Sequence, residues 1–302
     1  MLRVSFPVRT VSVALALALA AVAARSQTPQ KTPQARKKPA LARVQGTPAA
    51  TPPVLEPRAL ELLKAMSAKL AAAHSLSFTA LSTYESPSRY GAPLAFTTVA
   101  DVLLQRPDKL RVITKGDGPV SEFYYDGKTM TQFAPAENLV AIADAPPTID
   151  AMLKTLYDKA GTYFTFTDVV VADPYGDMAP GLKLAFSIGQ SSVVGGTTTD
   201  MVAYEDEGVF VQLWIGAEDK LPRLSRAVFF DDPLQLRHQV ELSHWQIDPP
   251  AAAEAFASTK AAGADHIQFA HPKTQSKLPE APKPAGKPKR TAAAPKLTPK
   301  AQ

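Results

Sequence analysis

Short runs of β-branched and aromatic residues, separated by turn residues, fill the middle of this chain of 302 residues. Runs of this length, bounded by Gly, Pro, Asn or Asp, are typical of antiparallel strands. The runs that fit are residues 77–86, 94–105, 109–115, 121–126, 129–134, 138–144, 163–172, 182–188, 200–206, 209–215, 226–231 and 238–247. The pattern therefore predicts a mainly β domain in which successive strands pair as an antiparallel meander.

Two segments show the apolar spacing of amphipathic helices instead. The first lies in residues 56–75, and its stripe consists of Leu60, Leu63, Met66 and Leu70. The second lies in residues 148–161, and its stripe consists of Met152, Leu153, Leu156 and Tyr157. Apolar residues every three or four positions form one helix face that must pack on another element. The predicted fold class is therefore mainly β with α, an α+β protein.

The segment YYDGKTMTQFAPAENLVAIAD, residues 124–144, contains an acidic turn that could belong to an active site or only to a sheet. Asp126-Gly127 suits a tight hairpin because both residue types tolerate positive φ values. Pro135–Asn138 supplies a second set of turn residues between two strand-like runs. The expected role of the segment is structural: three short strands joined by two turns.

Four strings carry a resemblance to a known family: QRPDKLRV, YYDGKTMTQFAPAENLV, VQLWIGAEDKLPRLSRAVFFDDP and LSHWQIDPPAAAEAFAST. They are similar to an uncharacterised family of predicted periplasmic proteins, domain of unknown function 2092, in the LolA/LolB-like lipoprotein-carrier superfamily. The resemblance covers roughly residues 55 to 266. It implies a strongly curved antiparallel half-barrel of about 11 strands, with two or three helices covering the concave face and an apolar cavity between them.

The resemblance also implies a non-enzymatic binding protein for a hydrophobic ligand, which would be an acyl chain, a lipid or a lipidated protein. Strands in this sequence are apolar on both faces, so that one face must meet helices and the other more protein, a ligand or a membrane. We expect the cleft to be lined by Phe123, Tyr125, Phe210 and Trp214, although packing in an ordinary core would explain the same aromatic residues. Where the carriers have a Trp-aromatic run, this chain has Thr131 and Gln132, which puts lipoprotein binding itself in doubt.

The first 24 residues have the layout of a secretory signal peptide. Arg3 and Arg9 precede an uncharged apolar run, Val11 to Ala24, which ends in small residues. This layout predicts export to the periplasm and a mature chain that begins near Ala24, with a retained N-terminal anchor as the alternative.

Residues 25–54 and 272–302 are rich in Pro, Ala and Lys without apolar periodicity. Such segments bury too little surface to order themselves, so both are expected to be disordered, on either side of a folded unit at 55–271. Residues 1–58 hold nine Lys/Arg and one acidic residue, and residues 272–302 hold eight and one. These basic segments favour contact with an anionic envelope surface, or serve only as soluble spacers. Nucleic acid is not expected, because an exported chain rarely meets it and the tail has no aromatic residues for stacking.

Catalytic, metal and cofactor sites are not predicted. The chain has no cysteine, which excludes disulfides, thiolate metal sites and a cysteine nucleophile. On a strand, His238 and His244 lie about 20 Å apart and Glu241 faces the other way, so that one metal ion cannot join them. The acidic run Glu205–Glu207 fits a solvated turn. For the pair Asp231-Asp232, a role in general acid/base catalysis stays an open alternative. A monomer is expected, and the alternatives to a ligand carrier are an envelope sensor or scaffold and, with less support, a hydrolase.

Overall fold

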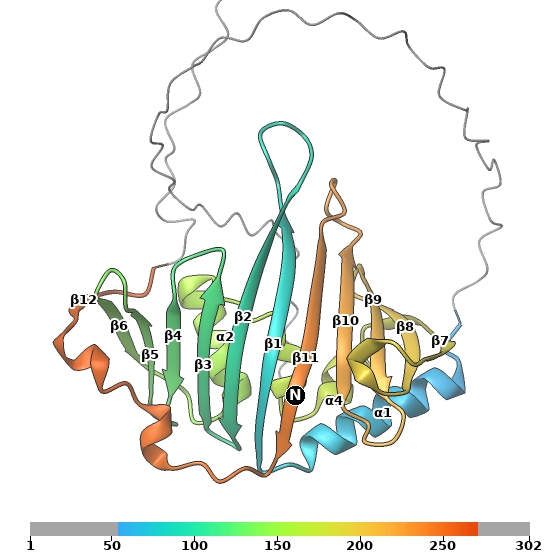
Figure 1. The fold of residues 1–302 in the computed structure, drawn as a ribbon, viewed down its shortest axis with the longest axis horizontal. Helices are drawn as coiled ribbons and strands as arrows, with labels where there is room; N and C mark the ends of the chain where they lie inside the picture. Colours follow the sequence, from blue (N-terminus) through green and yellow to red (C-terminus); the bar gives the residue numbers. More distant parts are fainter. Residues whose placement is uncertain (1–53, 271–302) are drawn as a thin grey trace, which may run out of the picture.

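The computed structural model describes residues 54–270, and these form one open sheet of 12 strands (Figure 1). The strands are β1 Ser75–Ser86, β2 Leu94–Gln105, β3 Lys109–Gly116, β4 Ser121–Tyr125, β5 Thr129–Ala134, β6 Leu139–Asp144, β7 Leu182–Ser191, β8 Thr199–Asp206, β9 Val209–Gly216, β10 Pro222–Phe229, β11 Arg237–Ile247 and β12 Asp265–Ile267. Their order in the sheet is β12-β6-β5-β4-β3-β2-β1-β11-β10-β9-β8-β7. All neighbours pair antiparallel except β12 and β6, which are parallel.

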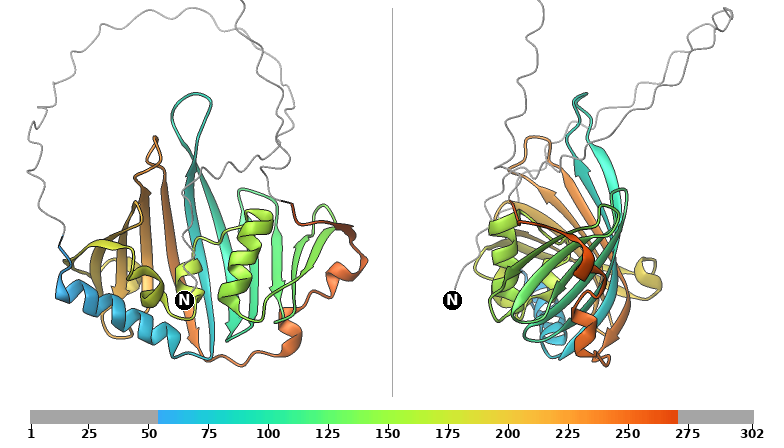
Figure 2. Two further views of the ribbon diagram at one scale, coloured as in Figure 1. Left: turned by 180° about the vertical axis from the view of Figure 1, so that it is seen from behind. Right: turned by 90° about the vertical axis from the view of Figure 1, so that its left-hand side faces the viewer.

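Four α-helices lie on one side of this curved sheet, as the two views of Figure 2 show. They are α1 Pro57–Ala71, α2 Ile149–Ala160, α3 Thr167–Val170 and α4 Pro174–Met178. The sheet bends around them, so their side is the concave one. The predicted curved antiparallel fold is therefore confirmed, with one strand more than the expected eleven and with two of the four helices very short. Within residues 54–270 no helix combines the length and the apolar character needed to span a membrane.

The predicted strand at residues 163–172 is wrong. Residues 163–166 have no regular structure and the helix α3 follows. Thr165 meets Ser82 of β1 through a hydroxyl pair with oxygens 2.6 Å apart, so the segment crosses over the concave face and does not extend the sheet. A short apolar run fits a buried helix as well as a strand, and periodicity alone does not separate the two.

The two turns predicted within residues 124–144 are confirmed. Asp126 Oδ1 accepts hydrogen bonds from the amides of Lys128 at 2.9 Å and Thr129 at 2.7 Å, and Gly127 has a φ of 93°. Asn138 closes the second turn with a φ of 53°. The Asp126 carboxylate therefore fixes the turn between β4 and β5, and the structural interpretation of this segment holds.

Chain segments next to the two described ends cover the edges of the sheet. On β7, Ala185 exchanges two backbone hydrogen bonds with residues 54 and 56, at 2.9 and 2.8 Å. At the other edge the chain after β11 passes beneath the sheet and adds β12 beside β6 (Figure 1). An uncovered edge strand offers free hydrogen-bonding groups to other chains, and these segments occupy part of both edges.

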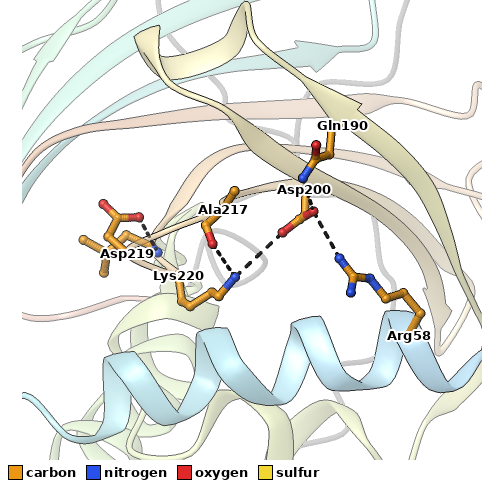
Figure 3. Close-up of polar contacts among 7 residues, drawn as sticks. Arg58, Gln190, Asp200, Ala217, Asp219 and Lys220 are labelled. Atoms are coloured by element: carbon orange, nitrogen blue, oxygen red, sulfur yellow. Dashed lines mark hydrogen bonds and ion pairs between the residues drawn. The ribbon is translucent and has the colours of Figure 1, made fainter.

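A polar network holds the start of α1 against β8 (Figure 3). Asp200 on β8 is buried, and its carboxylate accepts a hydrogen bond from the side-chain amide of Gln190 at 3.0 Å. It also lies 3.5 Å from the Arg58 guanidinium and 3.8 Å from Lys220 Nζ. A buried carboxylate needs such partners because desolvation disfavours its charge. The network therefore fixes α1 at the end of the sheet where β8 begins.

The predicted signal peptide at 1–24 and tail at 272–302 lie outside the described residues, as does the predicted linker at 25–54 apart from Val54. Their roles stay predictions. The extent of the predicted folded unit, 55–271, likewise stays a prediction.

Candidate functional site: a concave cleft

An open cleft of about 340 Å³ lies on the concave face, at the end of the sheet where β8 ends and β9 begins. Four neighbouring strands, β8 to β11, form its floor, and residues from α2 and from the segment 163–168 form one wall. The turn between β10 and β11 contributes the rim. Because α1 is fixed at the opposite end of β8, it leaves this end of the concave face open.

The floor of the cleft is apolar and follows the strand register. Val211 of β9 pairs with Ala227 of β10, and Val209 pairs with Phe229. On β11, Val240 belongs to the same face. Side chains directly opposite one another on a sheet lie about 5 Å apart, so these residues form a continuous apolar surface.

Carboxylates surround this surface. The acidic residues that line the cleft are Glu85, Asp168, Asp206, Glu207, Asp231 and Asp232. They come from the end of β1, from α3, and from the turns that join β8 to β9 and β10 to β11. None of the lining residues is a lysine or an arginine. The cleft thus combines an apolar floor with an acidic border.

Asp206 is one of two of these acids whose carboxyl has a raised pKa. Burial, and then the neighbouring charges of Glu207 and Asp168, raise the pKa of its carboxyl from 3.8 to about 6, while Lys183 acts in the opposite direction. Its Oδ1 is buried and has no hydrogen-bond partner among the described residues. A carboxylate in this position is costly to ionise, because Lys183 compensates for only part of the lost hydration.

On the concave side Tyr204 is buried, whereas the side chain of Asp168 is exposed. The Asp168 side chain opens into the cleft, yet the surrounding protein, and then Asp177, raises the pKa of its carboxyl. Tyr204 of β8 is buried, and its pKa is raised by burial and then by the charges of Asp168 and Asp206. The charge of Asp168 therefore acts on both Tyr204 and Asp206.

His238 also faces the cleft. Its ring packs edge-on against Phe229 with centroids 4.8 Å apart, and burial lowers the pKa of the imidazole despite the charge of Glu85. His244 lies six residues along β11 in an exposed position with a φ of 54°. Among residues 54–270 no three His, Asp or Glu side chains are grouped as metal ligands.

The four aromatic residues predicted to line a cleft are not brought together. Phe123 and Tyr125 of β4 are fully buried in the core under the helices, where the Phe123 ring lies 5.5 Å from that of Phe164. The Tyr125 hydroxyl donates a hydrogen bond to the carbonyl of Pro146 at 2.5 Å. These two residues therefore close the core at the α2 end of the concave side. Their role in ligand binding stays a prediction.

Phe210 and Trp214 lie on the other face of β9. Successive side chains on a strand alternate between faces, and Val209 and Val211 belong to the cleft. Phe210 instead stacks on the half-exposed ring of Phe230, with centroids 5.9 Å apart. Both residues are thus on the convex side, and five strands separate β9 from β4. A direct part for them in binding is likewise still a prediction.

The acids of the cleft were not predicted as a group. Glu205–Glu207 was interpreted as a solvated turn, and Glu207 and Gly208 do form a tight turn with φ values of 46° and 84°. The same turn also places Asp206 and Glu207 on the cleft. The available signal was the excess of acidic over basic residues between positions 59 and 271, which indicated an acidic body but not where its charges meet.

A smaller cavity of about 190 Å³ lies on the opposite side of β4 to β6, beneath the C-terminal segment. Its neighbour Glu122 is buried and accepts a hydrogen bond from the Tyr124 hydroxyl at 2.7 Å, and Lys260 Nζ lies 3.4 Å away. Burial, and then Glu122, raise the pKa of Tyr124 to about 12. These contacts fasten the C-terminal segment to the sheet, so the cavity is best explained as part of that junction.

Comparison with family models gives one match, described as "Predicted periplasmic protein (DUF2092)", over residues 59–270. Comparison with curated protein sequences finds no match.

Several solved structures are similar at low sequence identity. The complex of MucA and MucB from Pseudomonas aeruginosa matches with 16% identity, a TM-score of 0.39 and coverage of 67% of this chain and 62% of that chain. LprF from Mycobacterium bovis matches with 16% identity, a TM-score of 0.35 and coverage of 67% and 100%. A LolA superfamily protein from Nitrosomonas europaea matches with 9% identity, a TM-score of 0.32 and coverage of 66% and 97%. The match thus spans less than two thirds of the MucB chain.

Proposed function

The chain belongs to the DUF2092 family of predicted periplasmic proteins, and we propose that it binds a hydrophobic ligand in the concave cleft. The ligand is an acyl chain, a lipid or the lipid part of a lipidated protein, and it is held without covalent chemistry. The observation that carries this proposal is the apolar floor formed by β8 to β11, which the helices leave uncovered.

The energetics favour such a ligand. Each methylene group removed from water contributes about 0.8 kcal/mol, so a chain laid on Val209, Val211 and Ala227 is stabilised by burial alone. Ligand sites usually measure about 300 to 1,000 Å³, and the cleft of about 340 Å³ is at the lower end of that range. It would therefore hold one chain or part of one, with the polar end of the ligand at the rim.

Filling the cleft is expected to abolish binding. In the Ala227→Trp variant the indole would occupy the centre of the floor, whereas in Val228→Trp the same bulk lies on the opposite face of β10. We expect the affinity for the uncharged apolar dye N-phenyl-1-naphthylamine to fall by about tenfold or more in the first variant and by much less in the second. Fluorescence titration measures both. Equal binding by the two variants would place the dye elsewhere.

Purification of the protein from its own cell envelope without detergent tests the proposal directly. Native mass spectrometry followed by organic extraction is expected to show one acyl species near equimolar amounts. A stoichiometric protein partner with an empty cleft would instead support a sensor or scaffold that acts through protein contacts. An empty protein that also fails to bind the dye would contradict ligand binding in the cleft.

The basic residues outside the described part would add attraction to an anionic envelope surface. Such attraction is electrostatic, so it should weaken as salt is raised. It would keep the cleft near the membrane without contributing to the binding of the ligand itself.

A further inference from the structure

The cleft has an excess of negative charge that its own surroundings do not neutralise. Two of its six acids have partners: Glu85 lies 4.0 Å from the Arg237 guanidinium, and Asp232 Oδ1 accepts the amide hydrogen of Leu234 at 2.9 Å. Asp168, Asp206, Glu207 and Asp231 form no ion pair with any residue in the described range 54–270. Asp168, Glu207 and Asp231 are exposed to water, whereas Asp206 is half-buried and its Oδ1 is buried without a hydrogen-bond partner. A cation on a ligand would compensate for this negative charge beside the apolar floor.

Building on the proposed function, we propose that the cleft selects a hydrophobic ligand that carries a positive charge, an alkyl chain or other apolar body bearing an ammonium group. The apolar part lies on the floor of β9 and β10, and the ammonium group lies among the unpaired carboxylates.

The strand register places the two kinds of contact side by side. Asp206 is directly opposite Val209 across the β8–β9 pair, and Val209 is directly opposite Phe229 across the β9–β10 pair. A chain that covers Val209 and Phe229 therefore ends within one strand spacing, about 5 Å, of the Asp206 carboxylate. An ammonium group is thus brought to the acid by the same contacts that bury the chain.

Aromatic side chains in the wall add a second preference for cations. The lining includes Phe229 and the tyrosines Tyr157, Tyr163 and Tyr204. The face of an aromatic ring attracts a cation within about 6 Å, and clusters of such rings recognise alkylated ammonium groups. Carboxylates and aromatic rings in one apolar cleft therefore point to the same class of ligand.

A ligand with an anionic end would be repelled by the same carboxylates. Its charge would join Asp168, Asp206, Glu207 and Asp231, and the nearby cations, Lys183 and the Arg237 that pairs with Glu85, would offset it only in part. Like charges within a few ångströms disfavour binding, most strongly where water is partly excluded. Free fatty acids should consequently bind more weakly than amines of the same chain length.

Three ligands with one twelve-carbon chain test this selection: dodecyltrimethylammonium, neutral dodecanamide and dodecanoate. Calorimetric titration of the full-length protein is done below micelle-forming concentrations, at about pH 7.5, where carboxylates are ionised. We expect the cation to bind about tenfold or more tightly than the carboxylate, with the amide between them. Added salt should narrow this difference, because it screens the charges.

Charge-removing variants locate the effect. Asp206→Asn and, on the exposed rim, Asp231→Asn should each weaken binding of the cation several-fold and leave the amide nearly unchanged. Asp144→Asn, at the exposed end of β6 away from the cleft, is the matched control. Equal affinities for all three ligands, or tighter binding of dodecanoate, would overturn the selection for cations while leaving hydrophobic binding intact. Binding of none of them would contradict the proposed function itself.

Discussion

Replacing Leu63 with alanine is expected to destabilise the folded protein by about 2–5 kcal/mol. Leu63 lies in the middle of α1 with no exposed surface, and it packs into the core between the helices and the sheet. The substitution removes buried methyl groups and leaves a cavity that the sheet on one side and α4 on the other cannot readily fill. Urea unfolding followed by circular dichroism measures the change in the free energy of unfolding.

Leu60→Ala is the matched control for this experiment. Leu60 is on the same helix but is only partly buried at the margin of the core. Its replacement should cost about 1 kcal/mol, because less apolar surface leaves the protein interior. If the two variants lose similar stability, the buried face of α1 is not the one that the structure shows.

These two leucines also show how far periodicity predicts a helix. The sequence predicts the helix and most of its buried residues, since Leu63, Met66 and Leu70 are all buried. The buried face, however, is centred about one position away from the predicted stripe: Ala59 and Leu62 are buried while Leu60 is at its margin. An alanine contributes little to an apolar pattern, although its small side chain lets a helix approach the sheet closely.

The sheet, like the helix, could be predicted from local sequence patterns, but the cleft could not. Strand alternation and turn residues act locally, so each hairpin, such as the one at Asp126-Gly127, is visible in a few residues. The cleft is formed by residues that are distant in the sequence: Glu85, Asp168, Asp206 and Asp231 come from four separate elements. Only the folded structure shows that these four acids line one cleft. The strand predicted at residues 163–172 is wrong because its apolar residues belong to a segment that crosses over the concave face.

Replacing Asp206 with asparagine is expected to stabilise the protein at neutral pH. The pKa of the Asp206 carboxyl is about 6 in the folded protein and 3.8 ordinarily, so the folded state binds the proton more tightly than the unfolded state does. Stability contributed by the neutral acid is present below about pH 3.8 and is lost as the pH rises through about 6. A difference of this size corresponds to roughly 3 kcal/mol at most, since one pKa unit is about 1.4 kcal/mol.

The expected result is therefore a gain of about 1–3 kcal/mol for Asp206→Asn at about pH 7.5 and little or no gain at about pH 3.5. Chemical unfolding at both pH values measures it, with Asp144→Asn as an exposed control that should change stability by less than about 0.5 kcal/mol at either pH. A loss of stability at neutral pH would mean that the ionised carboxylate has a favourable partner.

A gain would mean that the folded protein retains an unfavourable charge beside the apolar floor. Proteins commonly tolerate such a cost where a residue serves binding, because selection acts on function once stability is sufficient. The same variant should then bind dodecyltrimethylammonium more weakly, so that stability and affinity change in opposite directions at one residue. Such opposite changes in stability and affinity would distinguish a carboxylate that binds the ligand from one that only destabilises the fold.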